Sequence, residues 1–366
     1  MKLLYKFFVL TVAAPAIMAF QLTASAEEQA EQKIKFSGSI GLEGSYNKSE
    51  PKAGKDVESD GLSASADLGI EVNIEKNVTG FVGLTWEDND DDSYSLEIDE
   101  AYLKLGGNDA MPLFFRAGKM YVPFGKFETS MISDPLTLEI GETRGSAAEL
   151  GVNFAGFYLS GYAFNGAEDI YGEDDKTDNF GGSIGYAYES DSFSIEIGGS
   201  YINSLYEAGG LADSIGEQRD SFVNEDEDYL ALKDYVPGAA AYLVLKAAGF
   251  SLFGEYVVML DDPEFEKYDN ATSTLDTEKY DAMKAWNIEA GYTFNVAGKE
   301  TTLGVAYQGV KNAGDMLPET RYSGVLSVGI LEGTTFALQY AQDEYEKDAT
   351  DNDKASSITA KVEIEF

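Results

Sequence analysis

The chain has 366 residues, with 65 Asp and Glu against 26 Lys and Arg, a formal charge of -39, and neither Cys nor His. Such an acidic chain repels phosphate backbones, which argues against nucleic-acid binding. Disulfides, thiolate nucleophiles, Cys/His zinc sites and His general bases are excluded, so we expect neither an enzyme nor a resident cofactor. The 38 Gly, 23 Tyr and 21 Phe against 8 Pro favour a protein built of many strands.

The first residues have the three-part pattern of a secretory signal peptide. Lys2 and Lys6 precede an apolar run at 7–20, and small residues follow at 24–26. We expect residues 1–26 to be removed and residues 27–33 to form a short periplasmic N-terminus. A membrane anchor is the alternative, but the run is short and contains Pro15. No later stretch holds about 18 consecutive apolar residues, so the exported chain is either soluble or a membrane β-barrel.

Alternating apolar and polar residues predict strands along the rest of the chain. From Leu62 to Ile74 every second residue is apolar, and the residues between them are polar or small, including Asp67 and Glu71. The same alternation recurs at 193–201, 286–295 and 358–366, with isolated carboxylates such as Glu196 and Glu289 on the polar face. We predict strands at 34–46, 61–75, 78–87, 95–105, 112–119, 147–154, 156–164, 179–189, 192–203, 235–247, 249–258, 284–296, 300–310, 320–330, 333–342 and 355–366.

The connections between these strands indicate the architecture. Short connections, as at Ala155 and Ala248, alternate with long ones, which is typical of a barrel with short periplasmic turns and long external loops. About sixteen strands of roughly ten residues suit a tilted crossing of the bilayer. We therefore predict an all-β transmembrane antiparallel barrel over residues 34–366, in the outer membrane of a Gram-negative bacterium; a secreted sandwich is the alternative.

Three positions in these strands call for comment. The apolar phase slips between Ile98 and Ala101, which predicts a bulge. Pro237 is expected near the outer end of its strand, because proline cannot donate to the ladder. Phe366, which ends the last alternating strand, resembles the terminal signature that the barrel-assembly machinery recognises in bacterial outer-membrane barrels.

Acidic residues concentrate in the predicted external loops, where we expect divalent cations to bridge them to lipopolysaccharide phosphates. Residues 88–99 have some features of a calcium loop, with Asp88, Asp90 and Asp92 as candidate ligands. However, Ser93 stands where glycine is required, and Asp99 ends the segment in place of Glu. Solvated loop charge is therefore the preferred interpretation.

The long connection at 118–144 differs from the other loops, because it is less acidic and rich in apolar residues such as Phe127 and Leu136. We predict that it folds into the lumen and narrows the barrel. Arg144, with Arg116 and Lys119 or Lys126 nearby, would form a positive element facing acidic walls. Alternatively, Arg144 could tie the loop to Glu142 or Glu149. The residues predicted to line the constriction or solute path are Arg116, Lys119, Tyr121, Pro123, Phe124, Gly125, Lys126, Glu128 and Arg144.

The same loop carries a family resemblance. The segments PFGKFET at 123–129, MISDPLTLE at 131–139 and GETR at 141–144 resemble the LbtU-type siderophore porins of Gram-negative bacteria. The resemblance implies passive or facilitated passage of a ferric siderophore across the outer membrane. Energised siderophore receptors carry a plug domain inside about 22 strands, and residues 27–33 are too few for one.

Two other functions stay open at this point. One is a general or cation-preferring diffusion porin, since an anionic chelate would be repelled by so acidic a channel. The other is a surface adhesin or structural barrel that uses its acidic loops. The expected partners are a ferric siderophore or another small solute, outer-membrane lipids and lipopolysaccharide, and the assembly machinery. The sequence leaves a homo-oligomer open.

Overall fold

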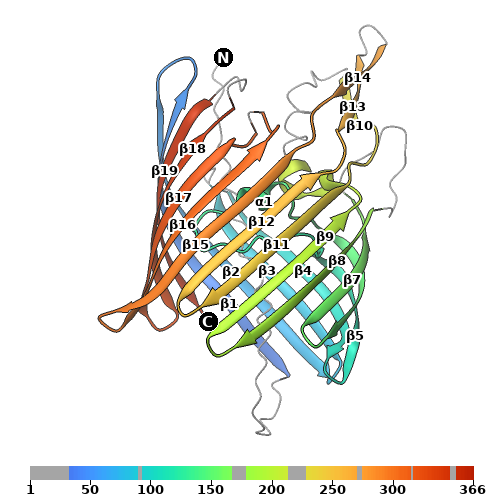
Figure 1. Ribbon diagram of the computed structural model, residues 1–366, viewed down its shortest axis with the longest axis vertical. Helices are drawn as coiled ribbons and strands as arrows, with labels where there is room; N and C mark the ends of the chain where they lie inside the picture. The colour runs from blue at the N-terminus through green and yellow to red at the C-terminus, as the bar shows by residue number, and fades with distance from the viewer. Residues whose placement is uncertain are drawn as a thin grey trace.

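The computed structural model describes residues 33–89, 93–166, 179–212, 228–269, 274–314, 316–346 and 352–366. Sixteen strands form one closed antiparallel barrel (Figure 1), as predicted. The predicted signal peptide and almost all of the predicted periplasmic N-terminus lie outside the described residues. The barrel strands are β1 (Ile34–Pro51), β2 (Val57–Glu75), β3 (Val78–Asn89), β4 (Ser93–Asn108), β5 (Met111–Tyr121), β6 (Arg144–Phe154), β7 (Phe157–Phe164), β8 (Asn179–Ser190), β9 (Phe193–Ile202), β11 (Gly238–Ala247), β12 (Phe250–Met259), β15 (Lys284–Val296), β16 (Lys299–Lys311), β17 (Thr320–Leu331), β18 (Thr334–Glu344) and β19 (Asn352–Glu365).

The barrel closes where its first strand meets its last. β1 pairs with β19 in antiparallel register from Ser39 opposite Glu365 upward. Beyond that pair, Gly38 N–H donates to the Phe366 carbonyl at 3.0 Å, and Phe366 N–H donates to the Gly38 carbonyl at 3.1 Å. Phe366 thus lies at the closing seam, and its role in assembly stays a prediction.

Short turns join the strands at one end of the barrel, and the long connections lie at the other (Figure 1). At Ala155-Gly156 the φ angles are 52° and 84°, and at Ala248-Gly249 they are 49° and 85°. Two successive positive φ angles define a type I′ turn, whose twist matches that of the flanking strands. These two-residue turns fix the register of their hairpins.

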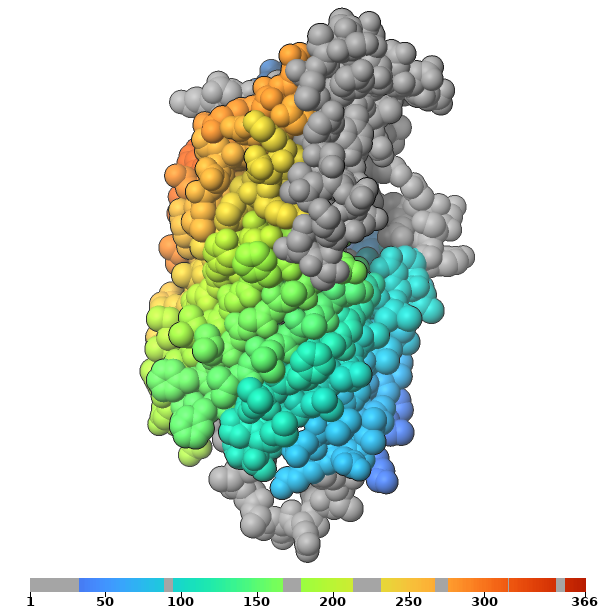
Figure 2. Space-filling view, turned by 90° about the vertical axis from the view of Figure 1, so that its right-hand side faces the viewer, coloured from blue at the N-terminus to red at the C-terminus, as the bar shows by residue number. Residues whose placement is uncertain are grey.

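The outer wall carries exposed apolar side chains from the barrel strands. Figure 2 shows one side of this wall, with the cyan and green strands facing the viewer. Toward the loop end, Trp286, Tyr307 and Tyr322 form a row with ring centroids 6.3 and 5.3 Å apart. Toward the turn end, Phe250 and Tyr292 lie 4.5 Å apart. Aromatic girdles above and below an aliphatic band are typical of a barrel in a membrane.

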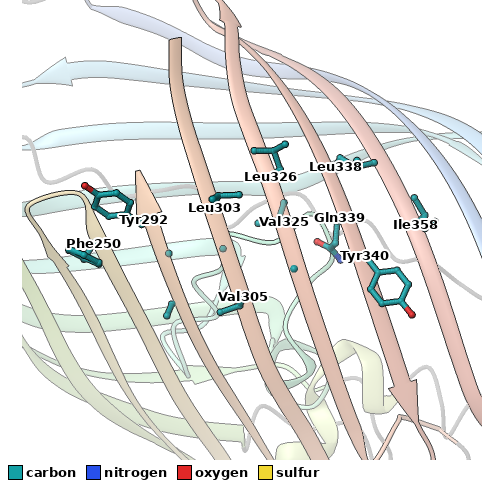
Figure 3. A pocket seen from close by; sticks show the side chains of 14 residues that line it. Phe250, Tyr292, Leu303, Val305, Val325, Leu326, Leu338, Gln339, Tyr340 and Ile358 are labelled. Carbon is teal, nitrogen blue, oxygen red and sulfur yellow. The ribbon is translucent and has the colours of Figure 1, made fainter. Parts of the chain in front are cut away.

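A hollow of about 730 Å³ indents this outer wall over β15–β19 (Figure 3). Its lining is almost wholly apolar and includes Leu303, Leu326, Leu338 and Tyr340. The hollow therefore belongs to the outer, lipid-facing surface and not to the lumen.

Three further strands lie outside the barrel, at its loop end (Figure 1). They are β10 (Asp228–Leu232), β13 (Glu264–Asp269) and β14 (Thr274–Lys279), which pair in the order β10-β13-β14. The sequence analysis placed these segments in long loops without strands. Strands of five or six residues are too short to show the alternation that identifies the longer strands of the barrel.

The structure confirms the bulge expected near Ile98 but corrects the position expected for Pro237. The register between β3 and β4 shifts between Gly83 and Leu84, so that Asp99 has no partner, which confirms the bulge. The strand predicted at 235–247 begins only at Gly238, so the expectation that it contains Pro237 was wrong. Proline has no N–H to donate to the ladder, and the strand starts after it. Among the described residues no helix is long and apolar enough to cross a membrane.

Candidate functional site

Residues 122–143, here called loop 3, leave the wall after β5 and return to it at β6. The loop contains the short helix α1 (Leu136–Glu139) and lies inside the barrel (Figure 1). Its apolar side chains are almost fully buried, with exposed fractions of 2% for Phe124, 1% for Leu136 and 3% for Leu138. The predicted infolding of this loop is confirmed, and its apolar content is the physical cause.

One buried carboxylate on β12 holds two parts of loop 3. Glu255 accepts the backbone N–H groups of Lys126 at 2.6 Å and Phe127 at 3.0 Å. The same carboxylate accepts the Thr137 hydroxyl at 2.9 Å. An irregular backbone inside a barrel must find acceptors for its N–H groups, and a carboxylate offers several lone pairs. Glu255 therefore joins the start of loop 3 to its helix.

A second carboxylate, Glu289 on β15, holds the middle of the loop. It accepts the Thr129 hydroxyl at 2.7 Å and the Ser130 N–H at 2.9 Å, and its exposed fraction is 0%. Further along the wall, Gln308 on β16 accepts the Leu136 N–H at 3.0 Å. Gln339 on β18 accepts from Ile132 and donates to the Ser133 hydroxyl. Loop 3 is thus tied to a broad section of the lumen wall.

Sequence reasoning named Glu289 as a mid-strand carboxylate but gave it no role, and it missed Glu255, Gln308 and Gln339. The available signal was a polar residue on the inner face of an otherwise apolar or small-residue strand, as in FGEYVVM around Glu255. That signal marks the lumen side, but the partner cannot be read from it.

The predicted residues Pro123, Phe124 and Gly125 form the first turn of loop 3. Phe124 N–H donates to the Val122 carbonyl at 2.8 Å. Gly125 has a φ of 73°, and a Cβ there would lie 2.3 Å from the Phe127 ring. Only glycine combines this left-handed backbone with such close approach.

Two charged side chains of loop 3, Lys126 and Glu128, are paired with the wall. Lys126 Nζ lies 3.0 Å from Glu196 Oε2 on β9. Lys246 on β11 lies 2.9 Å from Glu128. Both ion pairs are partly accessible, and each joins one positive to one negative group. Lys126 of loop 3 and Lys246 of the wall therefore present no unpaired positive charge to a passing solute.

Arg116 faces the lumen from β5 but is also paired. Its guanidinium lies 2.9 Å from Glu149 on β6 and 5.2 Å from the centre of the Tyr102 ring. Arg116 is 8% exposed and Glu149 4% exposed. The pair is a buried link between neighbouring strands.

Lys119 and Tyr121 alternate with Arg116 and share the face of Leu113 and Phe115, which is the outer face of β5. Lys119 Nζ donates to the Ile98 carbonyl at 2.7 Å, and the Tyr121 hydroxyl donates to Asp99 at 2.9 Å. Both hydrogen bonds reach residues of β4 that lie outside the segment of β4 paired with β5.

Arg144, opposite Tyr121 in register, also reaches β4. It pairs with Asp99 at the bulge and lies 3.8 Å from Glu97. Among the described residues its ion pairs are with Asp99 and Glu97, and not with Glu142 or Glu149, the two carboxylates considered from the sequence. The structure brings Lys126 and Glu128 together on loop 3, but it does not gather the four basic residues into one cluster.

A second infolded segment supports loop 3. Leu205, Tyr206 and Leu211 follow β9 and join the hydrophobic cluster that contains Phe124 and Leu138. Gly209 N–H donates to the Glu142 carbonyl at 2.9 Å. Burial, together with nearby Asp134 and Asp99, raises the pKa of the Glu142 carboxyl to about 8, although Arg144 acts in the opposite sense. This second segment was not predicted.

The infolded segments cover one side of the lumen and leave another side accessible. Inward residues of β12, β15 and β16 are buried, whereas those of β19, β1 and β2 are partly accessible. The name accessible arc is used below for the inward faces of β19, β1 and β2. Its charged residues include Glu43, Asp67, Glu71, Lys361 and Glu363.

The candidate calcium ligands cannot be compared as a set, because Asp90 and Asp92 lie outside the described residues and only Asp88 lies within them. Within the described part of the chain, no group of three or more His, Cys, Asp or Glu residues is arranged to hold a metal ion.

Comparison with known proteins places this barrel among porins. Residues 11–363 match the family model described as Gram-negative porin. A UPF0422 protein of Coxiella burnetii is 28% identical over 317 residues, covering 85% of this chain and 64% of that protein. A UPF0422 protein of Legionella pneumophila strain Paris is 25% identical, covering 85% of this chain and 59% of that protein. The chain thus spans about three-fifths of the length of these curated relatives.

Two solved structures share the fold at low sequence identity. OprB of Pseudomonas putida matches with a TM-score of 0.57 at 13% identity, covering 91% of this chain and 94% of that one. The anion-selective porin from Comamonas acidovorans matches with a TM-score of 0.58 at 12% identity, covering 91% of this chain and 99% of that one. At these identities the likeness shows the fold alone.

Proposed function

Because the chain belongs to the Gram-negative porin family and forms an outer-membrane β-barrel, we propose that it is a passive diffusion channel for small hydrophilic solutes, narrowed by loop 3. The observation that carries the proposal is the placement of loop 3. It is hydrogen-bonded to β12, β15, β16 and β18, while the accessible arc keeps its polar side chains open. A sixteen-stranded barrel is wide enough for an aqueous path, and such a loop reduces its cross-section.

The second candidate is uptake of a ferric siderophore, which the resemblance of loop 3 to LbtU-type porins favours. Several side chains of that motif, including Phe124, Phe127 and Leu138, are buried. They determine how the loop folds and offer no surface to a solute. The motif therefore supports a shared loop conformation more directly than a shared ligand.

Liposome swelling tests the channel, using purified protein and neutral sugars of increasing size. We expect entry of small sugars and a steep decrease in rate with size, because loop 3 restricts the path. Folded protein that admits no sugar would refute the channel. Uptake of a labelled ferric chelate by iron-limited cells, with and without the gene, tests the second candidate. Equal uptake by both strains would refute it.

A further inference from the structure

We propose that the accessible arc makes this channel selective for cations, with Asp67 as the main determinant and Glu43 as the second. The inference rests on the proposed channel function and adds a solute class to it, namely hydrated metal cations and small organic cations. It assigns selectivity to the barrel wall and not to loop 3, where the sequence analysis had placed a positive element.

Two charged side chains of loop 3, Lys126 and Glu128, are compensated by the wall. Lys126 is paired with Glu196, and Glu128 is paired with Lys246. The carboxylate of Glu255 is almost fully buried and receives its hydrogen bonds from the loop itself. A solute that passes these side chains therefore meets compensated charges.

The accessible arc is different, because its lysines are already engaged. Lys35 lies 2.9 Å from Glu71, and Lys361 lies 2.9 Å from Glu363. Glu43 stands opposite Lys361 in register, but the ammonium group of Lys361 is bonded to Glu363. Among the described residues, Glu43 and Asp67 in the middle of the arc's strands have no bonded cation.

Of these two carboxylates, Asp67 has the surroundings that support the proposal more strongly. It lies in the middle of β2 and accepts the Ser39 hydroxyl at 2.9 Å and the Thr85 hydroxyl at 3.0 Å. In the described part of the chain no Lys or Arg pairs with it. The two hydroxyl donors carry no charge, so they do not compensate the carboxylate at the accessible part of the lumen.

The size of the effect follows from Coulomb's law. A unit charge about 4 Å from an ion in water contributes about 1 kcal/mol, which corresponds to roughly fivefold enrichment of cations over neutral solutes. Salt at about 1 M reduces the screening length to about 3 Å, whereas at about 0.1 M it is about 10 Å. Selectivity should therefore be measured at the lower salt concentration.

Reversal potentials across planar bilayers in a KCl gradient test the proposal. We expect the wild-type K⁺/Cl⁻ permeability ratio to exceed one, and Asp67→Asn to lower it about two- to fivefold. Asp67→Glu should keep the wild-type ratio, and adding Glu43→Gln to Asp67→Asn should lower it further. The matched control is Glu344→Gln combined with Lys354→Met, which removes a paired positive and negative charge at exposed positions of β18 and β19 and should leave the ratio unchanged.

The outcomes separate this inference from the proposed function. A wild-type channel that prefers Cl⁻, or an unchanged ratio in Asp67→Asn, overturns cation selection at the arc while the channel stands. Folded wild-type protein without any conductance overturns the channel and this inference together. If Asp67→Asn does not fold, Glu43→Gln alone must lower the ratio, and an unchanged ratio again overturns the proposal.

Discussion

At the scale of single residues, Glu142 holds a carboxyl group whose pKa is raised from 4.5 to about 8, chiefly by burial. Between about pH 5 and pH 8 the folded protein retains a proton that the unfolded chain has released. The free energy of unfolding therefore decreases as pH rises through this window, by at most about 4 kcal/mol.

Glu142→Gln should abolish this contribution, because the amide stays neutral at every pH. We expect the variant and the wild type to have similar unfolding temperatures near pH 4.5 and the variant to be more stable at pH 9. Glu363→Gln, which removes a carboxylate paired with Lys361, controls for the loss of one charge. Equal unfolding temperatures for Glu142→Gln and wild type at pH 9 would refute the raised pKa of Glu142.

At the scale of elements, Glu255 determines whether loop 3 stays in place. Glu255→Ala leaves two backbone N–H groups and one hydroxyl without their acceptor, and each loss costs about 1–3 kcal/mol. The chain has no cysteine, so a single Leu138→Cys reports on the loop. We expect Glu255→Ala to accelerate maleimide labelling of this cysteine by about tenfold or more.

The comparison for that experiment is Glu363→Ala, which removes a lumen carboxylate that loop 3 does not contact. It should leave the labelling rate of Leu138→Cys at the wild-type value. The account of loop 3 fails if Glu255→Ala and Glu363→Ala label at the same rate.

The same elements show what the sequence could predict. Strands such as β15 follow from alternation within about ten residues, so they were placed correctly before the structure. The hydrogen bonds of loop 3 join residues far apart in the chain, as Lys126 and Glu255 are 129 positions apart. No local pattern identifies such a partner. The loop's infolding was predictable from its apolar content, but its anchors were not.

Charge placement was harder to predict than strand placement. The sequence left two roles open for Arg144, a positive element at the constriction or a pair with Glu142 or Glu149, and in the structure it binds Asp99. That partner becomes available because a bulge leaves Asp99 unpaired where β4 extends beyond β5. The bulge was predicted from the phase slip, yet its position relative to Arg144 depends on the register of two strands.

At the scale of the whole molecule, a small part of the acidic excess lies on the inner wall of the barrel, at residues such as Glu43 and Asp67. One side of the barrel is filled by loop 3 and the segment after β9, whose charges are largely paired or buried. The remaining path runs along the accessible arc, where Asp67 keeps its negative charge. Narrowing and selectivity thus belong to different parts of the same lumen.

The most direct test of this account is the single-channel conductance of the purified, folded barrel in a planar bilayer. The wild type should give discrete openings, and Glu255→Ala combined with Glu289→Ala should give a larger conductance, because loop 3 loses both carboxylate anchors. Circular dichroism and heat-dependent gel mobility verify that both proteins are folded barrels. Folded wild-type protein without openings, or a conductance that the double variant leaves unchanged, would contradict a channel narrowed by loop 3.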